Sequence, residues 1–283
     1  MGFAESVSKG RQLSIEKPSV GIIAAVLVYL AVDLTVKLTG TTVFAFGFQI
    51  VGGSLTIGSL LSMVLDGLLV GLAVGLAGIG LSMTYSILDF ANFAHGDTVT
   101  VGAFLGWVAA YVVAGLGTDT GLASLFLFNS GQQLSVVSAL GPVLLGLLVA
   151  GVGTVGVVLL IDRLTYRPMR ESDNISLLIA SIGVALALRY LITFVFGTQT
   201  SGVASSGARF ELVPGLSITD NEIALLFVGV ALMLAVHLLL QRTKLGKAMR
   251  AMADNEDLAR VTGIPTERVI RLTWILGGGL AGI

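Results

Sequence analysis

The feature that most constrains the fold of this chain is a series of long stretches that carry almost no charge. Six stretches, at 20–38, 63–88, 98–115, 136–161, 175–196 and 223–240, are predominantly apolar, and a seventh begins near Leu272. A helix needs about 20 such residues to cross the hydrocarbon core of a bilayer. The sequence therefore predicts an all-α fold, a polytopic transmembrane helical bundle of about seven spans.

The composition excludes several other classes of protein. Hydrophobic residues make up 55% of the chain and charged residues 12%, whereas a soluble domain carries about 25% charged residues. The net charge of −1 provides no basic surface for nucleic acid. Cysteine is absent and only 2 histidines occur, so the sequence predicts neither a metal site nor a cofactor.

The two ends of the chain carry separate expectations. Residues 1–19 contain Lys9, Arg11 and Lys17 ahead of the first apolar run. That run is too long for a signal peptide and lacks a cleavage pattern, so we expect a short tail followed by a membrane domain at 20–283. The seventh apolar stretch has about 12 residues before Ile283, too few to cross a bilayer, which predicts a protein that is incomplete at its C-terminal end.

The distribution of basic residues predicts the orientation of the spans. Lysine and arginine are concentrated in the N-terminal tail and in the loops after the fourth and sixth spans, whereas 117–135 has none and 198–221 has one. Cytoplasmic loops are enriched in such residues. We therefore expect a multi-pass protein of the cell membrane with its N-terminus in the cytoplasm. The basic loop residues are Arg163, Arg167, Arg170, Arg242, Lys244, Lys247, Arg250, Arg260, Arg268 and Arg271.

Polar residues interrupt the apolar sequence at two places of possible functional interest. Asn92, His95 and Asp97 lie between the second and third spans, either in a short turn at the cytoplasmic mouth or in a re-entrant break that lines a pathway. Arg189 lies inside the fifth span, where a charge suggests function. It could equally pair with Asp66 or with backbone carbonyls, so all four residues are candidates for either a translocation pathway or a structural role.

The segment 241–271 predicts two short helices outside the bilayer. Leu245, Ala248, Met249 and Met252 recur at helical spacing among basic residues, which is typical of an amphipathic helix. Asp254 or Asn255 can cap a second helix that runs to about residue 261, and Gly263 is suited to end it. These helices could coat lipid headgroups or dock in the groove of a partner protein.

Motifs for catalysis are missing from the sequence. There is no G-x-x-x-x-G-K-[ST] phosphate-binding loop, no H-E-x-x-H pair and no G-x-S-x-G elbow. Such motifs carry ATP hydrolysis, zinc-dependent hydrolysis and serine hydrolase chemistry respectively. We therefore assign no catalytic residue, and expect any ATP hydrolysis to take place in a separate subunit.

Four segments in their order and spacing resemble the branched-chain amino-acid permeases of ATP-binding-cassette (ABC) importers. Residues 81–85 followed by 92–97 read Leu-Ser-Met-Thr-Tyr and Asn-Phe-Ala-His-Gly-Asp; 166–170 read Tyr-Arg-Pro-Met-Arg; 177–184 read Leu-Leu-Ile-Ala-Ser-Ile-Gly-Val. Residues 242–251 and 261–264 resemble the coupling loop of that family. The resemblance covers roughly residues 65–283.

The resemblance implies a multi-subunit transporter. Members of the family pair with a second permease, two cytoplasmic ATP-binding subunits and an extracytoplasmic solute-binding protein. It implies that 241–271 is a cytoplasmic coupling loop. Importers of this class carry a Glu-Ala-Ala-x-x-x-Gly pattern there, and the matching residues of this chain are Asp257, Leu258, Ala259 and Gly263. Asp257 stands in place of the glutamate, and Leu258 stands in place of the first alanine. The apolar Leu245 and Met249 complete the candidate coupling residues.

The sequence thus favours the permease subunit of an ABC importer for branched-chain or related amino acids, with a small-molecule cargo. An alternative keeps the same machine and changes the cargo to urea or short amides. A secondary transporter or channel would be expected to show inverted repeats and paired intramembrane charges, and neither was found. A membrane-embedded enzyme would need a nucleophile and a base at one depth, which so few histidines disfavour.

Overall fold

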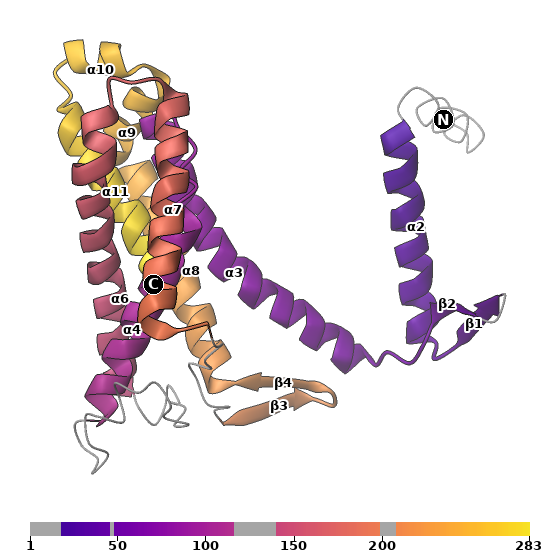
Figure 1. The fold of residues 1–283 in the computed structure, drawn as a ribbon. Coiled ribbons are helices and arrows are strands. Elements are labelled where there is room, and N and C mark those ends of the chain that lie inside the picture. The colour runs from indigo at the N-terminus through magenta and orange to yellow at the C-terminus, as the bar shows by residue number, and fades with distance from the viewer. Residues whose placement is uncertain (1–17, 46–47, 116–139, 199–207) are drawn as a thin grey trace. The chain divides into compact units, whose positions relative to one another are not determined.

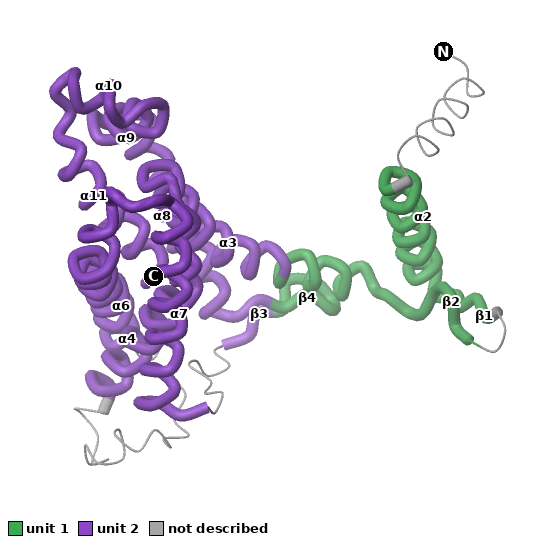
Figure 2. The backbone as a smooth tube through the Cα atoms, turned by 45° about the horizontal axis from the view of Figure 1, so that its top comes forward, with its two compact units in different colours: residues 1–66, 211–217 green, residues 67–210, 218–283 purple. Residues whose placement is uncertain are grey.

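A computed structural model describes residues 18–45, 48–115, 140–198 and 208–283, drawn as a ribbon in Figure 1. The chain divides into two compact units, residues 1–66 with 211–217 and residues 67–210 with 218–283 (Figure 2). The candidate functional residues lie in the second unit. The two units are described separately below.

Six of the described helices are long and apolar enough to cross a membrane, which confirms the predicted polytopic helical class. The fourth continues beyond Ile161 as a π-helix, η1 (Asp162–Tyr166), and a 3₁₀ turn, η2 (Arg167–Met169). The seventh predicted span corresponds to α11 (Thr266–Gly282), a helix of 17 residues that begins before Leu272. The six are α2 (Pro18–Leu38), α3 (Ile57–Leu88), α4 (His95–Gly115), α6 (Leu140–Ile161), α7 (Asn174–Phe196) and α8 (Asp220–Arg242).

Two small antiparallel hairpins were not predicted. β1 (Thr42–Ala45) pairs with β2 (Phe48–Gly52), and β3 (Arg209–Val213) pairs with β4 (Leu216–Thr219). The first hairpin is attached to α2 by Asp33, whose carboxylate accepts a hydrogen bond from the Gly52 amide at 2.8 Å and pairs with Lys37 at 2.6 Å. The apolar segment 41–62 is therefore divided between this hairpin and the first turn and a half of α3.

Close helix contacts in the second unit depend on small residues. α4, α6 and α11 pack together, and at their crossing a Cβ atom added to Gly102 would lie 2.5 Å from the Gly282 Cα and 2.8 Å from the Thr154 hydroxyl. Four residues further along α4, a Cβ on Gly106 would approach the Gly146 carbonyl oxygen of α6 to 3.2 Å. Such contacts allow helix backbones to approach closely in a bilayer.

Two short helices, α9 (Lys244–Asp254) and α10 (Glu256–Val261), connect α8 to α11 and confirm the predicted pair. The Thr243 hydroxyl accepts a hydrogen bond from the Gly246 amide at 3.1 Å, and the Asn255 side chain accepts one from the Leu258 amide at 2.8 Å. Both are N-caps, which satisfy amides that a helix leaves open. Gly263 has φ +87° and turns the chain toward α11.

Candidate functional site

A re-entrant segment, residues 89–94, separates α3 from α4. α3 ends at Leu88, and Asp89 then takes a left-handed conformation with φ +54°. The Nε2 atom of His95, at the start of α4, lies 2.8 Å from the carbonyl oxygen of Ala77. Ala77 precedes the end of α3 by 11 residues, which is about 16 Å of helix. The segment therefore runs back alongside α3, and we call it the re-entrant segment for this path.

Side chains satisfy the non-helical backbone of this segment. The Asn92 Oδ1 atom accepts hydrogen bonds from the Ala94 amide at 3.1 Å and from the Tyr166 hydroxyl at 3.0 Å. The Ser181 hydroxyl of α7 accepts one from the Phe93 amide at 3.1 Å. Irregular backbone at membrane depth requires such partners. Asn92 is therefore the residue that holds the segment together, and η1 and α7 supply its outer contacts.

Asp97 and Arg189 form an ion pair between α4 and α7. Arg189 Nε donates to Asp97 Oδ1 at 3.1 Å, and its Nη2 donates to Oδ2 at 3.3 Å. The Arg189 side chain is 64% exposed and that of Asp97 10% exposed. The carboxylate partner of Arg189 is thus Asp97 in place of the Asp66 suggested by the sequence. Asp97 also lies in the first turn of α4, where a negative charge is favoured.

An aromatic cluster connects η1 to α11 and to the re-entrant segment. The Tyr166 ring stacks on Trp274 with centroids 5.3 Å apart and an interplanar angle of 5°, and it contacts Phe90 at 5.2 Å. Tyr166 and Trp274 are among the most deeply buried side chains described. The sequence analysis assigned no role to either, although Tyr166 lies in the Tyr-Arg-Pro-Met-Arg motif that supported the family resemblance.

Arg170, in the same motif, bridges two carboxylates. Its Nη2 atom donates to both Asp162 oxygens, at 2.8 and 2.9 Å, and its Nη1 atom donates to Glu267 Oε1 at 2.7 Å. Asp162 belongs to η1 and Glu267 to the first turn of α11. This site was also missed from the sequence, because 97 residues separate Arg170 from Glu267.

The candidate coupling residues of 241–271 fall into two groups. Met249 and Ala259 are buried and Leu245 is half-buried, all facing the core of the chain. The exposed group consists of Asp257, Leu258 and Gly263. Leu258 is 62% exposed, and Val261, which the sequence analysis did not select, is 85% exposed. The amphipathic face of α9 thus packs inward, and the outward apolar side chains belong to α10.

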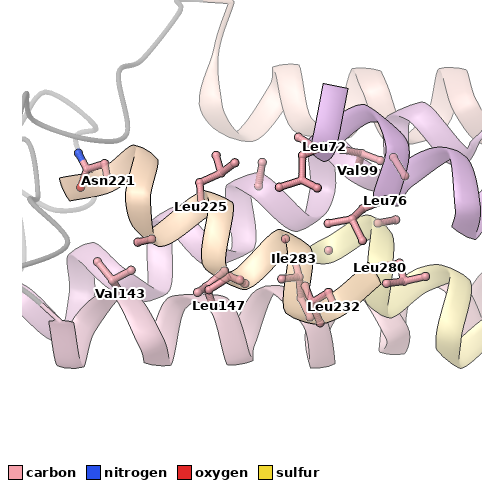
Figure 3. A pocket seen from close by; sticks show the side chains of 18 of the residues that line it. Leu72, Leu76, Val99, Val143, Leu147, Asn221, Leu225, Leu232, Leu280 and Ile283 are labelled. Carbon is pink, nitrogen blue, oxygen red and sulfur yellow. The ribbon is translucent and has the colours of Figure 1, made fainter. Parts of the chain in front are cut away.

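An apolar cavity of about 550 Å³ lies among α3, α4, α6, α8 and the C-terminal end of α11 (Figure 3). Among the residues described around it, Asn221 is the polar one, and the rest are apolar, such as Leu72, Val99 and Leu225. This lining offers no charge to an amino or carboxyl group. Within the described ranges, no cluster of three or more His, Asp or Glu could hold a metal ion.

Membrane-length helices, a re-entrant segment between two of them and a folded pair of short helices outside them define a multi-pass membrane protein. Comparison with known proteins identifies the family. Residues 63–283 match the family described as "Branched-chain amino acid transport system / permease component". The chain therefore belongs to this family. No solved structure gave a match in the same comparison.

Individual relatives are similar over most of the chain. The high-affinity branched-chain amino acid transport system permease protein LivH of Escherichia coli (strain K12) is 28% identical over 236 residues, covering 79% of this chain and 68% of LivH. BraD of Pseudomonas aeruginosa, with the same description, is 26% identical over 228 residues, with the same coverage. A probable LivH of Methanocaldococcus jannaschii is 31% identical over 234 residues, covering 78% of this chain and 64% of that protein.

Proposed function

We propose that this chain is the permease subunit of an ATP-driven importer that carries branched-chain or closely related amino acids across the cell membrane. Its N-terminus would lie in the cytoplasm, on the same side as the basic loops at 163–170 and 242–271. Family membership supports this function, and the cargo is the one for which LivH and BraD are described.

The proposal includes partners that the chain itself would have to contact. These are a second permease subunit, cytoplasmic ATP-binding subunits that hydrolyse ATP, and an extracytoplasmic binding protein that delivers the cargo. No phosphate-binding loop occurs in the sequence, which agrees with hydrolysis in separate subunits. The chain must then present a surface through which it receives the movement of the ATPase.

The exposed face of α10 is the observation that carries this proposal. Leu258 and Val261 project from a helix outside the predicted spans, while Ala259 of the same helix is 3% exposed and anchors it. Two large apolar side chains that are exposed to solvent on a short helix whose other face is buried are typical of a helix that inserts into a partner's groove. We propose that α10 docks on an ATP-binding subunit and that the buried Met249 and Ala259 fix its position against the core of the chain.

The test is co-purification of an ATP-binding subunit with the tagged protein. Full burial of an apolar side chain contributes about 1.5–3 kcal/mol, so replacing Leu258 and Val261 together with serine should weaken docking by roughly 100-fold or more. A matched control replaces Phe210 and Leu212, which are 51% and 60% exposed in β3, with serine. The control should retain the subunit as the wild type does.

Two results would contradict the proposal at different levels. If no ATP-binding subunit accompanies the wild-type protein, the importer function is wrong. If the subunit accompanies the wild type and both double variants equally, the importer function stands and the assignment of α10 as the docking helix is wrong. Membrane insertion of each variant, measured by its yield in washed membranes, shows that a loss of the partner is not a loss of folding.

A further inference from the structure

Two elements that are distant from each other in the sequence, η1 and α11, meet at Arg170. We call Arg170, Asp162 and Glu267 the Arg170 clasp. Its guanidinium holds the Asp162 carboxylate of η1 by two hydrogen bonds and the Glu267 carboxylate of α11 by a third. Glu267 is the fourth residue after Gly263, where the coupling loop turns toward α11. The clasp therefore connects the exit of the coupling loop directly to the end of α6.

The environment of the Arg170–Asp162 pair makes this part of the clasp firmer than an ordinary surface ion pair. The side chains of Arg170 and Asp162 are 19% and 11% exposed, so water screens this pair weakly. Burial alone would lower the pKa of the Arg170 guanidinium, but its hydrogen bonds and charge attraction to Asp162, and then to Glu267, raise that pKa. Arg170 thus remains charged, and its Nη1 and Nη2 atoms, which belong to one rigid planar guanidinium, hold the Glu267 and Asp162 carboxylates in fixed directions.

A second contact extends from the same place to the re-entrant segment. Tyr166 follows Asp162 by one turn in η1, and both side chains are buried. The Tyr166 ring stacks on Trp274 of α11, and its hydroxyl donates to Asn92. The Arg170 clasp therefore joins η1 to α11 by a charged bridge. Tyr166 of η1 contacts α11 through its stacked ring and residues 89–94 through its hydrogen bond.

We propose that Arg170 is a positioning residue for transport, which makes the start of α11, η1 and the re-entrant segment move as one body when the coupling loop moves. The inference rests on the proposed function, because the movement would come from an ATP-binding subunit docked on α10. Coupling between distant sites is carried by chains of packed side chains and by networks of hydrogen bonds and ion pairs. The Arg170 clasp and the Tyr166 contacts provide such a set from α11 to Asn92.

The clasp can be opened at its most exposed member without removing a buried charge. Glu267 is 60% exposed at its side chain, so Glu267→Gln removes the charge from the bridge to α11 and leaves the Arg170–Asp162 pair intact. Glu267→Asp retains the charge with one methylene less. Glu171→Gln, next to Arg170 and exposed, removes the same charge outside the clasp and is the matched control.

The experiment uses the complete transporter, with ATP-binding subunits and binding protein, in proteoliposomes. The measured quantity is leucine transported per ATP hydrolysed. Loss of the charge from an ion pair whose carboxylate is largely exposed should lower this ratio by up to about fivefold in Glu267→Gln, with partial recovery in Glu267→Asp and no change in Glu171→Gln. The amount of co-purifying ATP-binding subunit should be equal in all four proteins, because α10 is intact.

The possible outcomes separate the inference from the function on which it rests. Absence of the ATP-binding subunit from the wild-type protein would overturn the proposed function. Its presence, with an unchanged transport ratio in Glu267→Gln, would overturn the role of Arg170. A loss of the subunit from Glu267→Gln would also overturn it, since Glu267 would then belong to the docking surface. If the clasp had only a structural role, Glu267→Gln would lower the yield and the thermal stability of the protein and would leave the transport ratio unchanged.

Discussion

Replacing Asn92 with alanine should destabilise the protein through the two donors that it leaves without an acceptor. Asn92 Oδ1 accepts from the Ala94 amide and the Tyr166 hydroxyl, and Ala94 and Tyr166 are 1% and 2% exposed. A buried donor without a partner costs about 1–3 kcal/mol, so the two together should cost about 2–6 kcal/mol. Tyr166→Phe removes one hydrogen bond without leaving an open donor and should cost about 0.5–1.5 kcal/mol.

The free energy of unfolding can be measured by titrating the purified protein with sodium dodecyl sulfate in mixed micelles and following helicity by circular dichroism. The matched control is Asn174→Ala, which removes an exposed hydrogen bond, 3.0 Å long, from Asn174 to Asp89. We expect the control to lose less than about 1 kcal/mol. Equal losses from Asn92→Ala and Asn174→Ala would refute the argument that the re-entrant segment depends on Asn92.

A double-mutant cycle isolates the contact between Asn92 and Tyr166. In Asn92→Ala with Tyr166→Phe, the hydroxyl that had lost its acceptor is itself absent. The double variant should therefore be more stable than the sum of the two single losses predicts, by about 1–2 kcal/mol. Strict additivity would mean that the Tyr166 hydroxyl finds another acceptor when Asn92 is gone.

Two further predictions concern the corner between α8 and α9 and the Asp97–Arg189 ion pair. Gly246→Ala would drive a Cβ atom into the Leu240 backbone and should cost about 1–3 kcal/mol, which should appear as faster proteolysis of residues 241–271. The control is Gly156→Ala, whose new Cβ has no neighbouring atom within 4 Å. It should not change the rate of proteolysis. Arg189→Gln leaves the little-exposed Asp97 carboxylate without its charged partner at membrane depth and should lower the yield of monodisperse protein more than Asp97→Asn does. The double variant should recover part of that loss. Equal yields from the two single variants would contradict the argument.

Features that depend on local sequence were predicted well. Length and hydropathy located the six membrane helices because a bilayer sets the same requirement for every span. The second short helix was predicted to its last residue, since Asn255 caps it through a bond three residues away and Gly263 supplies the positive φ that the chain needs to leave it. These signals need no knowledge of the rest of the fold.

Features that depend on contacts distant in the sequence were not predicted. The partner of Arg189 is 92 residues away, and Glu267, one of the two partners of Arg170, is 97 residues away. No local pattern in a single sequence shows which of its distant residues are paired. The amphipathic pattern of α9 indicated that one face is covered, but a pattern cannot distinguish the chain's own core from a partner. The same limit applies to the hairpin β1–β2, which Asp33 fixes through a backbone amide 19 residues away.

The inward packing of α9 changes how the coupling loop must function. A helix of six residues such as α10 has almost no stability of its own, so its orientation comes from the Asn255 cap, from buried Ala259 and from α9 beneath it. Its docking surface is correspondingly small, and a small surface binds through a few dominant side chains. Leu258 and Val261 should then carry most of the affinity, while Glu267, a few residues further along, should carry the movement and little of the affinity. In the proposed mechanism α10 binds and the Arg170 clasp transmits, so binding and coupling should be separable by mutation.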